Sequence, residues 1–104
     1  MLTRTLKIER VYPLGDYKNI KFMDEFTDIP EHIATNPELI NKLFVMLMMQ
    51  CDLNYFQYAS IWKENNQFKD LEGAITKLND LIETTMNEMK IKFKNGHTVE
   101  DGQS

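Results

Sequence analysis

The sequence has little of several residue types, and each shortage excludes a class of protein. Its 104 residues include one cysteine, Cys51, so an intrachain disulfide is impossible and a reducing compartment is the expected setting. The most apolar run, residues 43–49, is far shorter than the roughly 20 residues that cross a bilayer. The first residues lack the apolar core of a secretory signal. We therefore expect a soluble protein of the cytoplasm.

Motifs for catalysis and for cofactor binding are also missing. The sequence contains no glycine-rich phosphate loop and no CxxC, HExxH or GxSxG motif. Neither His32 nor His97 has a second ligand at metal-binding spacing, so exposed histidines are expected. Cys51 falls on an apolar helix face, where a buried, unreactive thiol is the expectation. The sequence accordingly predicts no enzyme, no metal site and no cofactor.

Residues 5–26 predict an antiparallel β-hairpin, because two alternating runs flank a turn-rich segment at 15–19. A five-residue loop over 15–19 gives one aliphatic and aromatic face with a single opposite-charge pair, Arg10 and Asp24. A two-residue loop would instead set Arg10 against Lys21, which is less favourable. The predicted pairs are Leu14 with Ile20, Tyr12 with Phe22, Arg10 with Asp24, and Ile8 with Phe26.

The remainder of the chain is predicted to be two helices that pack as an antiparallel hairpin. Asn36 and Pro37 form a helix start signal, with asparagine as N-cap and proline in the first helical position. The first helix is expected over 37–63 and the second over 68–93. The second helix has a narrow apolar stripe, whereas the apolar arc of the first exceeds half its circumference. The first helix therefore needs two packing partners.

These elements predict an α+β fold of the order ββαα. One domain is expected over residues 1–96, followed by a disordered polar tail over 97–104. Two strands alone are at best marginally stable, and the sequence offers no clear third strand. A second copy of the chain could complete the sheet across a twofold axis, so we expect a homodimer.

Candidate functional residues lie on the hairpin and on the first helix. Asp52 is interpreted either as a carboxylate at the rim of the packed face, paired with a basic residue of the hairpin, or as a buried pair that fixes a subunit interface; catalysis is the remaining alternative. The helical methionines fit both core packing and a partner-binding groove. Contact with a partner protein is expected through Tyr17, Lys18, Asn19, Lys21, Met46, Met49 and Leu53. Core or dimer packing is expected of Phe44, Met48, Asp52, Tyr55, Phe56 and Trp62.

The charge distribution leaves a second hypothesis open. The net charge is −4, yet residues 1–21 hold five basic and two acidic residues, a balance of +3. A basic hairpin tip with Tyr12, Tyr17 and Lys18 could hold nucleic acid by stacking and by phosphate contact. Solvated strand charges explain the same pattern. A protein-interaction module is therefore the leading hypothesis, and a nucleic-acid-binding accessory protein is the alternative.

The segment from Val11 to Ile20 resembles the opening hairpin of small uncharacterised proteins of bacteriophages and related mobile elements. The matching positions are Tyr12, Leu14, Gly15, Tyr17 and Asn19. The resemblance implies a phage-encoded accessory protein, or an inhibitor of a host factor, that acts in the host cytoplasm. It assigns no catalytic or binding residue to the chain.

Overall fold

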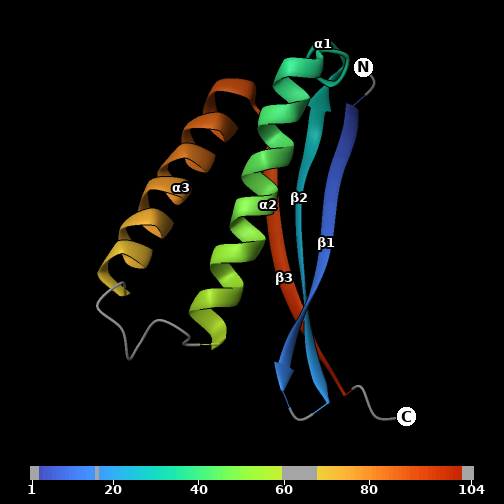
Figure 1. Ribbon diagram of the computed structural model, residues 1–104. Helices are drawn as coiled ribbons and strands as arrows, with labels where there is room; N and C mark the ends of the chain where they lie inside the picture. Colours follow the sequence, from blue (N-terminus) through green and yellow to red (C-terminus); the bar gives the residue numbers. More distant parts are fainter. Residues whose placement is uncertain (1–2, 16, 60–67, 102–104) are drawn as a thin grey trace.

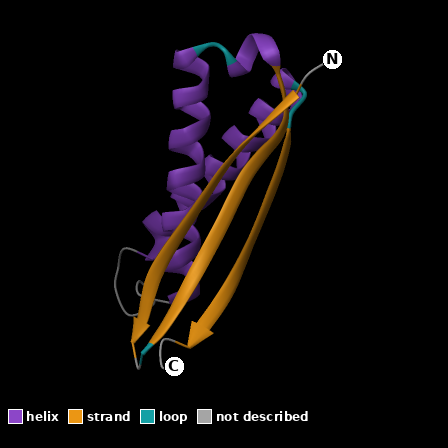
Figure 2. Ribbon diagram, turned by 90° about the vertical axis from the view of Figure 1, so that its right-hand side faces the viewer, coloured by secondary structure: helices purple, strands orange, loops and turns teal. Residues whose placement is uncertain are grey.

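The protein is a three-stranded antiparallel sheet whose helices all lie against one face (Figure 1). The computed structural model describes residues 3–15, 17–59 and 68–101. Figure 2 shows the strands side by side, with β2 between β1 and β3 and the helices behind them. The elements in chain order are β1 (Thr3–Gly15), β2 (Lys18–Pro30), α1 (Glu31–Ala34), α2 (Pro37–Ala59), α3 (Phe68–Met89) and β3 (Lys92–Asp101).

The predicted hairpin is present, but its register differs from the prediction by two residues. Gly15 already pairs with Lys18, so the connection is shorter than the predicted five-residue loop. Left-handed backbone at Gly15, with φ of 82°, and at Tyr17, with φ of 63°, makes the tight reversal possible. Because side chains alternate with a period of two, the shift leaves both predicted faces intact. The observed pairs include Tyr12 with Ile20, Arg10 with Phe22, Ile8 with Asp24, and Leu6 with Phe26.

The predicted pair between Arg10 and Asp24 is wrong, as a direct result of this shift. Asp24 lies opposite Ile8, and Arg10 lies opposite Phe22. The guanidinium of Arg10 instead reaches the carboxylate of Asp52 on α2, with 3.4 Å between Nη1 and Oδ1. The difference arises at the turn: Gly15, Lys18 and Asn19 pair in the strands instead of lying in a loop, and a bulge between Pro13 and Gly15 takes up one extra residue.

A second irregularity lies at the other end of the hairpin. Arg4 pairs with Ile29 and Leu6 with Phe26, so β2 has one more residue than β1 between these pairs. Asp28 adopts left-handed backbone there, with φ of 61°. The bulge changes the alternation of β2, and Phe26 and Ile29 are therefore both buried under the helices although they are an odd number of residues apart.

Helix α2 begins as the sequence predicts. The carboxamide oxygen of Asn36 accepts hydrogen bonds from two backbone amides of the first turn, at 3.1 and 3.3 Å. The helix packs on β1, on β2 and on α3, which supplies the two partners that its broad apolar arc requires. Leu43, Leu47 and Cys51 have no exposed surface. Residues 60–63, which were expected to end this helix, lie outside the described residues.

Helix α3 ends at Met89 rather than at residue 93. Lys90 has left-handed backbone, with φ of 57°, and the amide of Ile91 donates to the carbonyl of Met86 at 3.2 Å. This is the hydrogen bond of a Schellman ending, and the buried side chain of Ile91 supplies its apolar contact. The sequence predicts the helix end at Asn95-Gly96 instead, because lysine is an unusual residue at this left-handed position.

Residues 92–101 form the third strand, so the expectation of a disordered tail is wrong for residues 97–101. Strand β3 pairs antiparallel with β2, from Lys92 opposite Thr27 to Asp101 opposite Lys18. The chain thus supplies its own third strand, and the predicted ββαα order was incomplete. Residues 102–104 lie outside the described residues.

Candidate functional site

The hairpin residues predicted to contact a partner differ in exposure. Tyr17 is 74% exposed in the turn, and Lys18 beside it is also exposed. Asn19 and Lys21 are half-buried on β2, and the ammonium of Lys21 lies 3.9 Å from the carboxylate of Glu100 on β3. The turn therefore offers an aromatic ring and one lysine to solvent, while the strand that follows is engaged with β3.

The three helical residues predicted to contact a partner also differ. Met46 is only 6% exposed, and its sulfur accepts a hydrogen bond from the hydroxyl of Thr85 at 3.8 Å. Its assignment to a partner-binding surface is wrong, because α3 covers it. Leu53 is half-buried against the core, whereas Met49 is 47% exposed. Of the three, Met49 alone is a surface residue.

The residues predicted for core or dimer packing lie on two sides of α2. Met48 and Tyr55 pack against the core, while Phe44 is 42% exposed. Phe56 is half-buried, with its ring 5.7 Å from that of Tyr55. Trp62 lies outside the described residues. The surface side of α2 therefore includes Phe44, with Val45 and Met49 exposed on the same helix.

Asp52 fits the first interpretation made from the sequence, a carboxylate paired with a basic residue of the hairpin. Its Oδ1 accepts a hydrogen bond from the hydroxyl of Tyr12 at 2.5 Å and lies 3.4 Å from Arg10. The ring of Tyr12 stacks on that of Tyr55, with centroids 4.4 Å apart and 13° between the planes. The hydroxyl of Tyr55 donates to the carbonyl of Pro13 at 2.8 Å. These contacts fasten α2 to β1.

The electrostatics of this cluster suit a structural role. Burial raises the pKa of Tyr12 well above its ordinary value, and its hydrogen bond to Asp52 raises it further. A tyrosine in this state remains a hydrogen-bond donor throughout the physiological range. It is a poor source of phenolate for nucleophilic or base chemistry.

A second polar pair lies deeper, between β2 and α2. Asp24 has no exposed surface, and the thiol of Cys51 donates to its Oδ2 at 2.7 Å. The other carboxyl oxygen is buried without a hydrogen-bond partner. Burial raises the pKa of Asp24, while the hydrogen bond from Cys51 opposes the shift. Burial also raises the pKa of Cys51. The thiol is therefore protonated and buried, as the sequence predicts.

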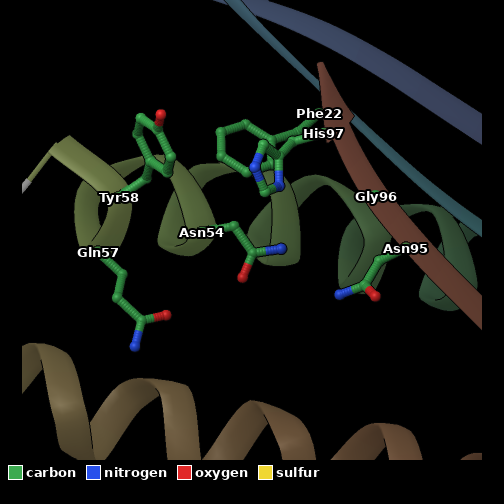
Figure 3. Close-up of a pocket in the computed structure, with 7 residues that line it drawn as sticks. All are labelled: Phe22, Asn54, Gln57, Tyr58, Asn95, Gly96 and His97. Carbon is green, nitrogen blue, oxygen red and sulfur yellow. The ribbon is translucent and has the colours of Figure 1, made fainter. Parts of the chain in front are cut away.

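A cleft of about 450 Å³ lies between the C-terminal half of α2 and the middle of β3. Figure 3 shows Tyr58, Gln57 and Asn54 projecting from α2, with His97 and Asn95 approaching from β3. Phe22 and Gly96 complete the lining. The rings of Phe22 and His97 lie 5.6 Å apart, and those of Tyr58 and His97 lie 5.4 Å apart. The described part of this lining is aromatic and amide-rich, and it contains no carboxylate, lysine or arginine.

The sequence did not identify this cleft, because three of its residues fall at the end of the chain where a helix end and a tail were expected. One signal was available. Ile91 and Phe93 alternate with Lys90, Lys92 and Lys94, which is the period of a half-buried strand.

No family model, curated protein or solved structure matches this chain significantly. Within the described ranges, no helix is long and apolar enough to cross a membrane. The same residues contain no group of three or more side chains suited to binding a metal ion.

Proposed function

We propose that the chain is a non-enzymatic protein-interaction module that works as a homodimer, joined along β3. The observation that carries this proposal is the free edge of β3. The strand is ten residues long, and in the described part of the chain it pairs on one side only, with β2 (Figure 2). A long, regular edge strand is a template for pairing with another chain.

The two edges of the sheet differ in how open they are to pairing. Strand β1 contains Pro13 and two register irregularities, and the carbonyl of Pro13 already accepts a hydrogen bond from the hydroxyl of Tyr55. Proline and bulges are features that prevent an edge strand from pairing with a second chain. Strand β3 contains no proline, and its register with β2 is continuous over all ten residues. Pairing through β3 is therefore favoured over pairing through β1.

The sequence of β3 is self-complementary in one antiparallel register, centred on Gly96. This register pairs Lys92 with Glu100, of opposite charge, on the outer face, and Phe93 with Val99 on the helix-covered face, where Val99 is 45% exposed in the single chain. Facing residues share a face of the sheet, so the helices of both copies lie on one side. The pairs are Lys92 with Glu100, Phe93 with Val99, Lys94 with Thr98, Asn95 with His97, and Gly96 with itself.

A cysteine scan tests this register. A Cβ added at Gly96 meets no atom within 4 Å, so Gly96→Cys fits the fold. In the proposed dimer the new thiols face each other, and mild oxidation should give a covalent dimer. The matched variants Lys94→Cys and Thr98→Cys place each thiol opposite a different residue and should not crosslink. Light scattering should give twice the chain mass for the unmodified protein.

Two results would overturn the homodimer. One is a single chain mass at micromolar concentration with no crosslink in Gly96→Cys. The other is equal crosslinking of the three cysteine variants, which indicates random collision. The exposed side of α2, with Phe44, Val45 and Met49, is not used by this assembly, because α2 packs on β1 and β2.

Nucleic-acid binding through the basic hairpin is the weaker candidate, because most of its cations already have anionic partners. In the described part of the hairpin, Lys18 is the basic residue without an ion pair. Tyr12 is stacked on Tyr55 and does not offer a free ring face on that side. Retention of single-stranded DNA that weakens steeply with salt would favour this alternative. The ion pairs are Arg4 with Glu31, Lys7 with Glu9, Arg10 with Asp52, and Lys21 with Glu100.

A further inference from the structure

The cleft between α2 and β3 has the size of a small-molecule site and is open to solvent on one side. Its volume of about 450 Å³ lies within the range of ligand pockets, roughly 300 to 1,000 Å³. Its residues come from α2, β2 and β3, so rigid elements rather than loops hold them in place (Figure 3). The cleft is independent of the polar pairs that fasten α2 to the sheet.

Three rings line the cleft, and none covers another in a parallel stack. Phe22 and Tyr58 meet edge to face, with centroids 6.4 Å apart and 78° between the planes. His97 is tilted by 46° to Phe22 and by 58° to Tyr58. Phe22 is 4% exposed and forms the floor, whereas Tyr58 is 47% exposed. Because Tyr58 and His97 are exposed, their ring faces are the ones open to a flat guest molecule.

Carboxamides surround the rings. The side-chain oxygen of Asn54 accepts a hydrogen bond from Gln50 at 3.0 Å, which leaves the amide hydrogens of Asn54 to donate elsewhere. Among the described residues, neither Gln57 nor Asn95 has a side-chain hydrogen-bond partner. A carboxamide offers a donor and an acceptor side by side, which matches the edge of a nucleobase.

Among the described residues, the lining contains no lysine, arginine, aspartate or glutamate. Apart from the imidazole of His97, these residues offer a phosphate or carboxylate no counter-charge, and they offer a cation no anion. Together, the ring faces, the free carboxamides and the missing charge select for a planar, uncharged molecule with polar edges.

We propose that this cleft binds a planar, uncharged nitrogen heterocycle of the nucleobase type, through stacking on Tyr58 and His97 and through hydrogen bonds to Gln57 and Asn95. The base can come from a free nucleoside or from an unpaired base of a strand. In both cases the base is recognised and the phosphate is not. The described lining residues all belong to one chain. In the proposed dimer Asn95 and His97 would lie opposite the second copy, so the cleft borders that interface.

Titration with adenosine, guanosine, cytidine and uridine, followed by NMR of the ¹⁵N-labelled protein, tests the proposal. At least one nucleoside should give saturable shifts confined to residues 54–58 and 95–97. Tyr58→Leu should weaken binding by about fivefold or more, the loss typical of one stacked base. Gln57→Ala removes an exposed carboxamide without touching the core and should also weaken binding. Tyr17→Leu, an exposed tyrosine outside the cleft, is the matched control and should bind normally.

The phosphate arm separates base recognition from charge recognition. The monophosphate of the best nucleoside should bind within about twofold of the nucleoside, with little dependence on salt. A short oligonucleotide that binds much more tightly, and loses this gain in Tyr58→Leu, supports a strand as the source of the base. The proposal is overturned if none of the four nucleosides gives saturable shifts at millimolar concentration. It is also overturned if Tyr17→Leu loses as much affinity as Tyr58→Leu, or if only the monophosphate binds and its binding depends steeply on salt.

Discussion

Replacement of Asp24 by asparagine should change how the stability of the protein depends on pH. The carboxyl group is fully buried, one of its oxygens accepts from Cys51, and the other has no partner. Burial therefore raises the pKa of Asp24 above its ordinary value of 3.8. The substitution keeps the shape of the side chain and removes the proton equilibrium.

The sign of the effect follows from proton binding in the two states. Between pH 3.8 and the higher pKa of Asp24 in the folded state, the folded protein holds a proton that the unfolded chain has lost. The stabilisation linked to this proton is fully present below the unfolded pKa and is lost as pH rises through the folded pKa. The loss amounts to about 1.4 kcal/mol for each pH unit. Asparagine has no such dependence.

Urea unfolding of both proteins between about pH 4 and 7 measures this effect. The free energy of unfolding of Asp24→Asn, relative to the unmodified protein, should rise by about 1.4 kcal/mol per pH unit until it reaches a plateau at the folded pKa. When Cys51→Ala is introduced into both proteins, a hydrogen bond that lowers the pKa of Asp24 is lost. The plateau in the difference between the two proteins should then move to higher pH. Asp80→Asn, an exposed acid on α3, is the control. A difference that stays constant across the pH range would refute the reasoning.

Three further substitutions test the packing. Tyr12→Phe removes the donor to Asp52 and should lower the free energy of unfolding by about 0.5 to 1.5 kcal/mol; a loss that persists in an Asp52→Ala background, which lacks the acceptor, would show that the hydrogen bond is not its cause. Asn36→Ala removes the N-cap of α2 and should cost about 1 kcal/mol in urea unfolding, and an unchanged midpoint would contradict the cap. Met46→Ala should cost about 2 to 5 kcal/mol, whereas Met49→Ala should cost less than about 0.5 kcal/mol; equal losses in thermal melts would contradict the placement of α3.

The faces of the hairpin could be predicted from the sequence, and its register could not. Alternation places Ile8, Phe22 and Phe26 on one face in any register shifted by two residues, so the apolar pattern constrains the face alone. The register depends on the turn, where Tyr17 adopts a left-handed conformation that is uncommon for tyrosine and therefore not predicted from the sequence. The predicted charge pair between Arg10 and Asp24 favours the wrong register, because the carboxylate that pairs with Arg10 is that of Asp52 on α2.

The helix starts could be predicted, but the end of α3 could not, and the cleft was missed with it. Asparagine and proline at 36–37 are a strong local signal, and the structure uses it. The ending at Lys90 depends on burial of Ile91 against the core, which is a tertiary contact. Once β3 was taken for helix and tail, its residues His97 and Asn95 could not be placed beside α2. The end of α3 and the cleft both depend on contacts between segments that are distant in the sequence, and residue type alone does not indicate such contacts.

The topology of the sheet also has a kinetic consequence. Strand β2 is joined to β1 by a short turn, whereas its other neighbour, β3, is separated from it in the sequence by α1, α2 and α3. Pairing between distant segments requires a large loop to close, and such contacts form late and slowly. We expect the hairpin and α2 to associate first and β3 to add last. The edge offered by β3 and the cleft beside it would then both form at that final step, and until then the edge of β2 would be unpaired.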